Sequence, residues 1–541
     1  MITPVETFTD AERELLRPHF TNLDRPVFAL INLPETVKGA LFARYSRYPG
    51  TLRRLFLEEF ADNLPAAPAW DGREGERAAQ LYERIFLGYG DDSVAQLGGA
   101  HVACEWVSNV LTKILQRPRL GAYLEQSTRY IAYDQPMPGA GASSGADAGS
   151  GRPAYRYYRD PELGPEYERA MDSLFDAYAR SLPRVVDWAQ REFPIRPGEA
   201  PGAHARALKA KALDLLRGLL PASSLSHMGI FASGQTYEQL ILHLLAHPLP
   251  EARGCGEQIL TELEAVMPSF VARVRRPDRG GEWVAYLESR ARAGERWAGR
   301  LGLTGEERPC GSGPHRGGPS VSLLRVDGDE DDLLAALLFE SGCASEAAAR
   351  AAVAALGAGE RAALLADLVG ERANRRHRPG RGFEALRYRF EIVADYGAFR
   401  DLQRHRMLTV QWQALTPDLG AGIPEQVELA GCGGDYARAL ERSRVEYDRL
   451  AAAGLREAAP YALCLGYRIR FVLDLNAREA MQLIELRSGR EGHPSYRAVA
   501  HEMHAQIAAV HPAVARAMSH VDTETEPRLE RILAEMRSLA R

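Results

Sequence analysis

The 541-residue sequence has no run of 18 or more apolar residues, the length that a transmembrane helix needs. Its first residues, MITPVETFTDAEREL, are polar and acidic, without the basic and then apolar segments of a secretory signal. We therefore expect a cytoplasmic protein with no membrane partner.

Cysteine is scarce and widely spaced, and no CxxC pair occurs. Cysteine-ligated zinc sites and disulfide frameworks both need cysteines at characteristic spacings, so we expect reduced, mostly buried thiols and no metal site. The HEMH run at His501–His504 lacks the i, i+4 histidine spacing of a zinc-protease helix. The six cysteines are Cys104, Cys255, Cys310, Cys343, Cys432 and Cys464.

An excess of positive charge is also missing. The 67 Lys and Arg residues face 72 Asp and Glu residues, a net charge of −5, whereas a dedicated nucleic-acid binder is normally basic. The hydrophobic content of 45% excludes a mainly disordered chain. At roughly 150 residues per domain, the length predicts two to four domains.

Two segments rich in glycine and proline punctuate the chain. Residues 136–153 are interpreted as a flexible surface insert, and residues 301–330, which include the Gly302–Pro319 run, as a linker. Most other segments have helical periodicity, and Leu386–Val393 alternates like a strand. We expect an α+β fold, rich in helices. The predicted helices are Ala205–Leu220, Gly256–Val274, Ala336–Leu356, Glu360–Arg375, Tyr436–Ala453 and Tyr496–Val510.

The two halves of the chain share two motifs in the same order. RPRLGAYLEQSTRY at 117–130 matches RHRMLTVQWQALTP at 404–417. Each is followed by an apolar segment with a proline near its start, at 219–245 and at 459–487. Shared order favours an internal duplication over coincidence.

These segments resemble the flavin-dependent thymidylate synthases, the ThyX family, whose signature is RHRxxSxxxxSxR followed by an N-A-R and L-x-L-R block. The resemblance implies two fused domains of that family, residues 1–300 and 331–541, each with a small, mostly antiparallel sheet. It also implies FAD as cofactor, NADPH and methylenetetrahydrofolate as co-substrates, and methylation of dUMP to dTMP. The family needs no enzyme nucleophile, and Pro309-Cys310 lacks the context of the cysteine-dependent thymidylate synthases.

Each half keeps a different part of the signature. The first half has Pro118 and Ala122 in place of the first His and Ser. Its retained residues are Glu125, Ser127, Arg129 and Arg217. Arg217 stands four positions before Pro221. The second half has Trp412, Ala414 and Thr416 at the later positions, and Thr409 is a hydroxyl substitute for the first Ser. Its retained residues are Glu384, Arg404, His405, Arg406, Asn476, Arg478 and Arg487. By sequence, Gly234, Thr236 and Leu245 stand opposite Asn476, Arg478 and Arg487.

The resemblance assigns roles to these residues. Arginines suit phosphate groups because the guanidinium binds them bidentately and stays charged. The residues expected to bind dUMP are Glu125, Ser127, Arg129, Arg217 and Arg487, with Ser127, Arg129 and Arg487 closest to the chemistry. Those expected to bind the flavin are Glu384, Arg404, His405, Arg406, Thr409, Asn476 and Arg478.

Family members are homotetramers with active sites between subunits. We hypothesise that the two halves complement each other in one composite site, and that a homodimer of this chain forms a pseudo-tetramer. Mutating Arg129 and Arg487 separately tests this hypothesis, because each change should then weaken nucleotide binding.

Some departures keep alternatives open. Residues Gly90–Gly98 have Asp91 and Gln96 where the family has His and Glu, and Asp401 replaces a Gln three residues before Arg404. An acidic group there would repel a phosphate. The alternatives are flavin-dependent methylation of another pyrimidine or of RNA, and a non-catalytic relative that binds flavin and nucleotide.

Overall fold

The computed structural model describes residues 6–61, 96, 98–135, 155–197, 199–303, 318–525 and 529. The insert predicted at 136–153 and most of the Gly90–Gly98 segment lie outside these residues. The chain divides into two compact units, each containing segments from both halves of the sequence. Unit 1 comprises Met1–Arg180, Leu219–Glu307 and Arg438–Cys464, and unit 2 comprises Ser181–Gly218, Arg308–Ala437 and Leu465–Arg541.

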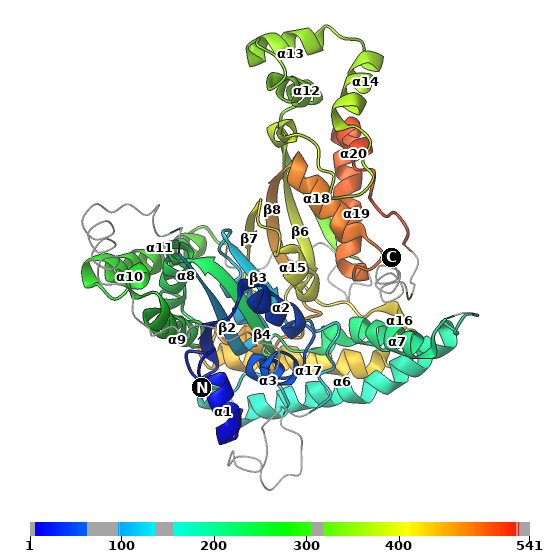
Figure 1. Cartoon of the computed structure of the whole chain (residues 1–541). Helices are drawn as coiled ribbons and strands as arrows, with labels where there is room; N and C mark the ends of the chain where they lie inside the picture. Colours follow the sequence, from blue (N-terminus) through cyan, green and yellow to red (C-terminus); the bar gives the residue numbers. More distant parts are fainter. Residues whose placement is uncertain are drawn as a thin grey trace. The chain divides into compact units, whose positions relative to one another are not determined.

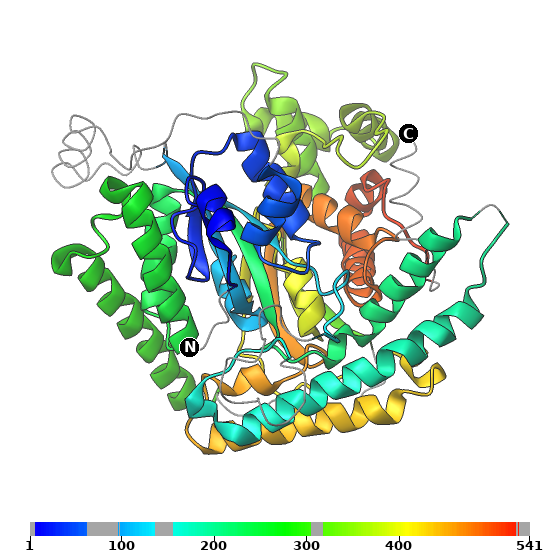
Figure 2. The ribbon, with the colours of Figure 1, turned by 60° about the horizontal axis from the view of Figure 1, so that its bottom comes forward.

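Unit 1 is built on an antiparallel sheet in the order β1-β2-β4-β3. Its helices α8 and α9 lie on one face of this sheet and α2 and α3 on the other (Figure 2). The strands are β1 (Val27–Leu30), β2 (Gly99–Ser108), β3 (Gly121–Glu125) and β4 (Leu225–Ser233). The helices that belong wholly to this unit are α1 (Asp10–Leu16), α2 (Glu35–Tyr45), α3 (Leu52–Glu59), α5 (Asn109–Leu115), α8 (Gly234–Leu245), α9 (Pro250–Val266), α10 (Pro268–Val271) and α11 (Glu282–Arg300).

The N-terminal segment of unit 1 forms a hydrophobic core against the sheet. Leu16, Phe28, Leu41 and Phe56 are fully or almost fully buried in it. Phe42 packs where a β-carbon on Gly229 of β4 would lie 2.8 Å from its ring, so this strand has no side chain at that point. Strand β2 is buried along almost its whole length.

Unit 2 contains a second antiparallel sheet, in the order β5-β6-β8-β7. Helices α18 and α19 lie side by side next to this sheet (Figure 1). Its strands are β5 (Ser320–Asp327), β6 (Arg387–Asp395), β7 (Thr409–Trp412) and β8 (Arg468–Asn476). Its helices are α7 (Pro201–Leu216), α12 (Glu330–Phe339), α13 (Glu346–Ala354), α14 (Ala358–Val369), α15 (Tyr396–Leu402), α16 (Glu425–Leu429), α18 (Ala477–Ser488), α19 (Pro494–Val510) and α20 (Pro512–Ala517).

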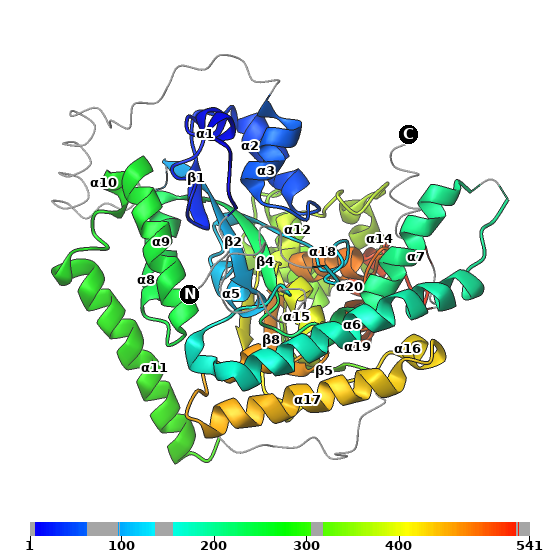
Figure 3. The same cartoon turned by 90° about the horizontal axis from the view of Figure 1, so that it is seen from below.

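The long helices α6 (Gly164–Glu192) and α17 (Gly433–Ala452) each contribute residues to both units. The two helices run alongside each other (Figure 3). In unit 1, Arg449 of α17 donates a hydrogen bond to the carbonyl of Leu163, just before α6. In unit 2, Arg184 of α6 forms an ion pair with Asp435 of α17. The two contacts give an antiparallel pair.

The structure confirms the α+β class, with helices predominating and a small antiparallel sheet in each half. The predicted strand at Leu386–Val393 is β6, but the single helix predicted at Ala336–Leu356 is two helices. The helical pattern breaks at Gly342, and Ser345 then caps α13 by accepting the N–H of Ala348. Strand β5 lies within the 301–330 region, of which residues 304–317 are outside the described set. None of the described helices combines the length and hydropathy needed to cross a membrane.

Candidate nucleotide site in unit 2

The two sheets show how the halves correspond. Each is an antiparallel sheet with the same connectivity. The last strand of each sheet in sequence order, β4 or β8, leads into a 12-residue helix, α8 or α18. Ser233 caps α8 and Asn476 caps α18, each accepting a backbone N–H from the third residue of its helix. The correspondence drawn from sequence was therefore wrong by one residue. Ser233, Gln235 and Leu244, rather than Gly234, Thr236 and Leu245, occupy the positions of Asn476, Arg478 and Arg487.

The Arg-His-Arg segment lies in the turn between α15 and β7. His405 is 7% exposed, whereas its two arginine neighbours reach the surface. Arg404 approaches Asp401, with 3.9 Å between Nη1 and Oδ1. Arg406 forms neither a hydrogen bond nor an ion pair with any other described residue. The turn thus presents two cationic groups at the surface beside a buried imidazole.

His405 links two residues of α18. Its Nε2 accepts a hydrogen bond from Nε of Arg487 at 3.0 Å, so the ring proton lies on Nδ1, which is 3.1 Å from Oε1 of Glu479. Burial lowers the pKa of His405, which favours this neutral tautomer. Arg487 also lies over the ring of Tyr496, with 5.4 Å between Cζ and the ring centroid. The imidazole and the aromatic ring together fix the Arg487 guanidinium.

Arg217 brings a guanidinium from the first half of the sequence into unit 2. Its side chain is 4% exposed, and Nη1 donates to Oδ2 of Asp401 at 3.1 Å. Nη2 lies 3.8 Å from Oδ1 of Asp395, while Nε and Nη2 have no hydrogen-bond partner. A β-carbon on Gly397 would lie 3.0 Å from Nε, so the guanidinium packs directly against the backbone of α15.

The position of Arg217 depends on close backbone packing at the next residue. Gly218 accepts a hydrogen bond from the N–H of Gly466 at 3.0 Å. A β-carbon on Gly218 would lie 2.0 Å from the hydroxyl oxygen of Tyr436. This crossing of two chain segments therefore has room only for glycine, and it directs Arg217 toward α15.

Glu384, Asn476 and Arg478 form a second group at the start of α18. Nε of Arg478 donates to the carbonyl of Pro379 at 3.0 Å, and its Nη1 lies 3.5 Å from Glu384. Glu384 is also bound by Arg381 through two contacts of 3.2 Å. The side-chain oxygen of Asn476 caps the helix. These predicted flavin-binding residues share one end of α18, whereas Arg487 lies near the other end.

The structure also places the remaining predicted residues. Thr409 is half-buried in β7, opposite Asp474 of β8. Glu125, in unit 1, accepts hydrogen bonds from Lys113 and Gln116, both at 2.9 Å, and the Lys113–Glu125 ion pair is almost completely buried. These contacts give Glu125 a structural task inside unit 1, and its role in substrate binding stays a prediction.

Ser127 and Arg129 lie in a turn of unit 1. The hydroxyl oxygen of Ser127 accepts the backbone N–H of Arg129 at 3.2 Å, and the carbonyl of Ser127 accepts the N–H groups of Tyr130 and Ile131. Arg129 is 7% exposed. The turn is therefore ordered by its own backbone, and the catalytic assignment of both residues stays a prediction.

Sequence reasoning missed Glu479, which orients His405. A signal was present, because Asn476 and Glu479 have the N-x-x-E spacing of a capping box. The backbone of Glu479 makes the expected contact with Asn476, but its carboxylate binds His405 instead of returning to the cap. Among the described residues, no group of three or more His, Cys, Asp or Glu side chains is arranged to hold a metal ion.

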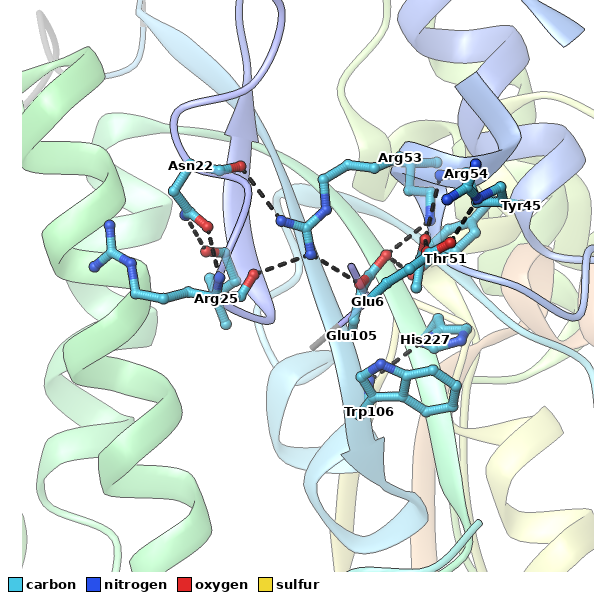
Figure 4. Close-up of polar contacts among 12 residues, drawn as sticks. Glu6, Asn22, Arg25, Tyr45, Thr51, Arg53, Arg54, Glu105, Trp106 and His227 are labelled. Carbon is cyan, nitrogen blue, oxygen red and sulfur yellow. Dashed lines mark hydrogen bonds and ion pairs between the residues drawn. The ribbon is translucent and has the colours of Figure 1, made fainter. Parts of the chain in front are cut away.

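Sequence reasoning also missed a buried polar network in unit 1 (Figure 4). Strand β2 has a bulge at Glu105 and Trp106, whereas β6 pairs with β8 without a register shift. Glu105 forms an ion pair with Arg53 at 3.4 Å, with both side chains about 1% exposed. The N–H of Trp106, which has a φ of 56°, donates to Nδ1 of His227 at 3.2 Å. The bulge thus connects the N-terminal helices to the sheet.

Comparison with known proteins decides the family. The sequence pattern of the family described as "Thymidylate synthase complementing protein" matches residues 53–269 and 334–513, one segment in each half. The chain belongs to this family. The resemblance predicted from the Arg-His-Arg and Asn-Ala-Arg motifs is confirmed, and the two matched segments with equal sheet connectivity establish a tandem duplication.

Two curated relatives match nearly the whole chain. A UPF0159 protein of Chlamydia muridarum is 36% identical, with 97% of this chain and 98% of that protein covered. A UPF0159 protein of Thermoplasma acidophilum is 30% identical, with 92% of this chain and 98% of that protein covered. A solved structure of the UMP/dUMP methylase PolB from Streptomyces cacaoi, bound with 5-Br dUMP, is 21% identical, with a TM-score of 0.31, and covers 38% of this chain and 96% of that chain.

Proposed function

We propose that this chain methylates the pyrimidine ring of a uridine nucleotide, converting dUMP to dTMP with FAD, NADPH and methylenetetrahydrofolate. One observation carries the proposal. Arg217, Arg404 and Arg487 come from three separate segments, and unit 2 brings them together around Asp401 and His405. Guanidinium groups clustered in this way suit the phosphate groups of a nucleotide substrate and of FAD. Membership of the thymidylate synthase complementing family supports pyrimidine methylation as the reaction.

The residues of unit 2 also fit FAD. Arg404 and Arg406 are exposed cations on one short turn, and Arg406 has no partner among the described residues. Two such groups match the charge of a pyrophosphate. When bound, FAD would supply the redox chemistry and carry the one-carbon unit, as the resemblance implies.

The protein groups then bind and orient the substrate. Arg487, held by His405, would bind the nucleotide phosphate, with Arg217 supplying further positive charge. Ser127 and Arg129 are proposed to complete the site in an assembly of two chains, a homodimer with four family domains. In this proposal no side chain forms a covalent bond with the substrate, so catalysis by the protein depends on orientation and electrostatics.

Purification and a turnover assay test the proposal. We expect a yellow protein with a flavin absorption spectrum, and tritium release from dUMP labelled at C5 when NADPH and methylenetetrahydrofolate are added. Replacing Arg487 by Ala should weaken dUMP binding at least tenfold. Arg444→Ala, which removes an exposed arginine paired with Glu441 and Asp448, is the control. A colourless protein that ignores added FAD would contradict the proposal.

Asp401 favours a second candidate, methylation of a different pyrimidine substrate. Its carboxylate already binds Arg217, one of the arginines proposed to meet the phosphate. Flavin reduction by NADPH without turnover of dUMP, together with turnover of another uridine compound, would support this candidate. Retained flavin without NADPH oxidation would indicate a non-catalytic relative.

A further inference from the structure

Asp401 occupies a central position among the cationic groups of unit 2. Its Oδ2 accepts a hydrogen bond from Nη1 of Arg217 at 3.1 Å, and its Oδ1 lies 3.9 Å from Nη1 of Arg404. The side chain is only 13% exposed. The negative charge of Asp401 also favours the charged form of Arg487, against the lowering of the pKa of Arg487 by burial. One carboxylate therefore acts on all three arginines.

The guanidinium of Arg217 uses only part of its hydrogen-bonding capacity. Asp401 binds Nη1, whereas Nε and Nη2, the two donors on the adjacent edge of the guanidinium, have no hydrogen-bond partner. That edge is the fork that binds a carboxylate or a phosphate bidentately. Unsatisfied donors on a buried side chain are costly, so a purely structural ion pair would be expected to use them. A second carboxylate, that of Asp395, has its Oδ1 3.8 Å from Nη2 and accepts hydrogen bonds from the hydroxyl of Ser495 and the N–H of Ala398.

A carboxylate and a phosphate bound to one guanidinium share its single positive charge and repel each other. We propose that Asp401 is an internal anion that competes with the substrate phosphate for the positive charge of Arg217, and so sets the affinity and selectivity of the site for phosphorylated ligands. This inference rests on the proposed nucleotide site. A phosphate group at the Nε and Nη2 edge of Arg217 meets the negative charge of Asp401 on the same guanidinium, whereas a nucleoside without phosphate does not.

The variant Asp401→Asn tests this inference, because the amide keeps the shape and a hydrogen-bond acceptor for Arg217 but removes the charge. Binding of dUMP, deoxyuridine and inorganic phosphate is measured by calorimetry at constant ionic strength. We expect D401N to bind dUMP and phosphate at least tenfold more tightly than the unchanged protein, with deoxyuridine affinity unchanged. Equal or weaker binding of dUMP and phosphate by D401N would overturn the inference.

Two further variants sharpen the test. Asp435→Asn removes the same charge from unit 2, in a pair with Arg184 at 3.1 Å, and it should leave phosphate affinity unchanged. Asp401→Gln, which restores the residue usual in the ThyX family, repeats the test if D401N does not fold. Equal tightening in D435N would mean that net charge alone is responsible, and would also overturn the inference.

The outcomes separate this inference from the proposed function. Tighter phosphate binding by D401N without any turnover of dUMP would retain the internal anion and reject thymidylate synthesis. Turnover of dUMP with phosphate affinity unchanged in D401N would retain thymidylate synthesis and reject the internal anion.

Discussion

The hydroxyl of Ser495 donates a hydrogen bond to Asp395 in unit 2, and the equivalent contact in unit 1 has its two partners exchanged. There, the hydroxyl of Ser108 donates to Glu251 at 2.6 Å. Asp395 and Ser108 cap equivalent helices, α15 and α5, and Ser495 and Glu251 each follow the proline that begins α19 or α9. The duplicated domains have thus kept one contact between a hydroxyl and a carboxylate while exchanging which element supplies each group.

Glu251 should contribute strongly to the stability of unit 1. It is 1% exposed and accepts hydrogen bonds from the N–H and hydroxyl of Ser108 and from the hydroxyl of Tyr461. Glu251→Ala leaves these buried donors unsatisfied, and we expect a loss of about 3 kcal/mol in the free energy of unfolding. Tyr461→Phe removes one bond and should cost about 1 kcal/mol. Urea denaturation measures both, and equal losses would contradict this account.

Gly397 should be required for the position of Arg217 rather than for the helix. A β-carbon there would lie 3.0 Å from Nε of Arg217, whereas one on Gly359 meets no atom within 4 Å. Both glycines are the second residue of a helix. Gly359→Ala should therefore stabilise the protein by up to about 1 kcal/mol, because alanine favours helices. Gly397→Ala should instead weaken dUMP binding at least threefold by calorimetry, and unchanged affinity would show that Arg217 accommodates the extra methyl group.

Much of the architecture was predictable from the sequence because it depends on local patterns. Alternation at 386–393 gave β6, and the helices at Tyr436–Ala453 and Tyr496–Val510 match α17 and α19 closely. The repeat was visible because Arg117 and Arg404 begin the same motif. Local periodicity and motif order predicted the elements and the repeat, but not the contacts between distant segments.

The contents of the site depend on contacts between distant segments. Arg217 lies 184 residues before Asp401, and only the crossing at Gly218 brings the two together. No pattern near Arg217 identifies its partner. The one-residue alignment of Ser233 with Asn476 was similarly hidden, because this register is set by strand pairing and not by composition.

His405 should act as a positioning residue for Arg487. His405→Ala removes the hydrogen bond to Nε of Arg487 and leaves the carboxylate of Glu479 free to move. We expect dUMP affinity to fall at least tenfold while the thermal unfolding midpoint changes by only a few degrees. His405→Gln, whose amide oxygen can accept from Arg487, should recover part of the affinity. His504→Ala on α19 controls for loss of a histidine, and equal effects of H405A and H405Q would show that the imidazole serves only to fill space.

His247 should make the protein less stable in acid. Burial is the main cause that lowers the pKa of His247 from 6.5 to about 4, with Arg117 and Arg253 adding to the shift. Because the pKa of His247 is lower in the folded state, between about pH 6.5 and pH 4 the unfolded chain binds a proton at this residue that the folded chain does not bind. Stability is therefore fully present above pH 6.5 and falls as the pH drops toward 4. For this residue alone, the loss between pH 7 and pH 5 is roughly 1 to 2 kcal/mol.

The variant His247→Gln removes this titration. In the unchanged protein, Nδ1 of His247 accepts the N–H of Leu249 at 3.1 Å, so the substitution also lowers the free energy of unfolding by an amount that does not depend on pH. Urea denaturation of both proteins at pH 5, 6, 7 and 8 separates the two effects, because only the titration changes the difference between the curves. The variant should lose less stability than the unchanged protein between pH 7 and pH 5. His227, whose pKa burial also lowers, still titrates in the variant, so part of the acid sensitivity remains. Parallel curves for the two proteins would show that His247 takes up its proton in the folded state as readily as in the unfolded chain.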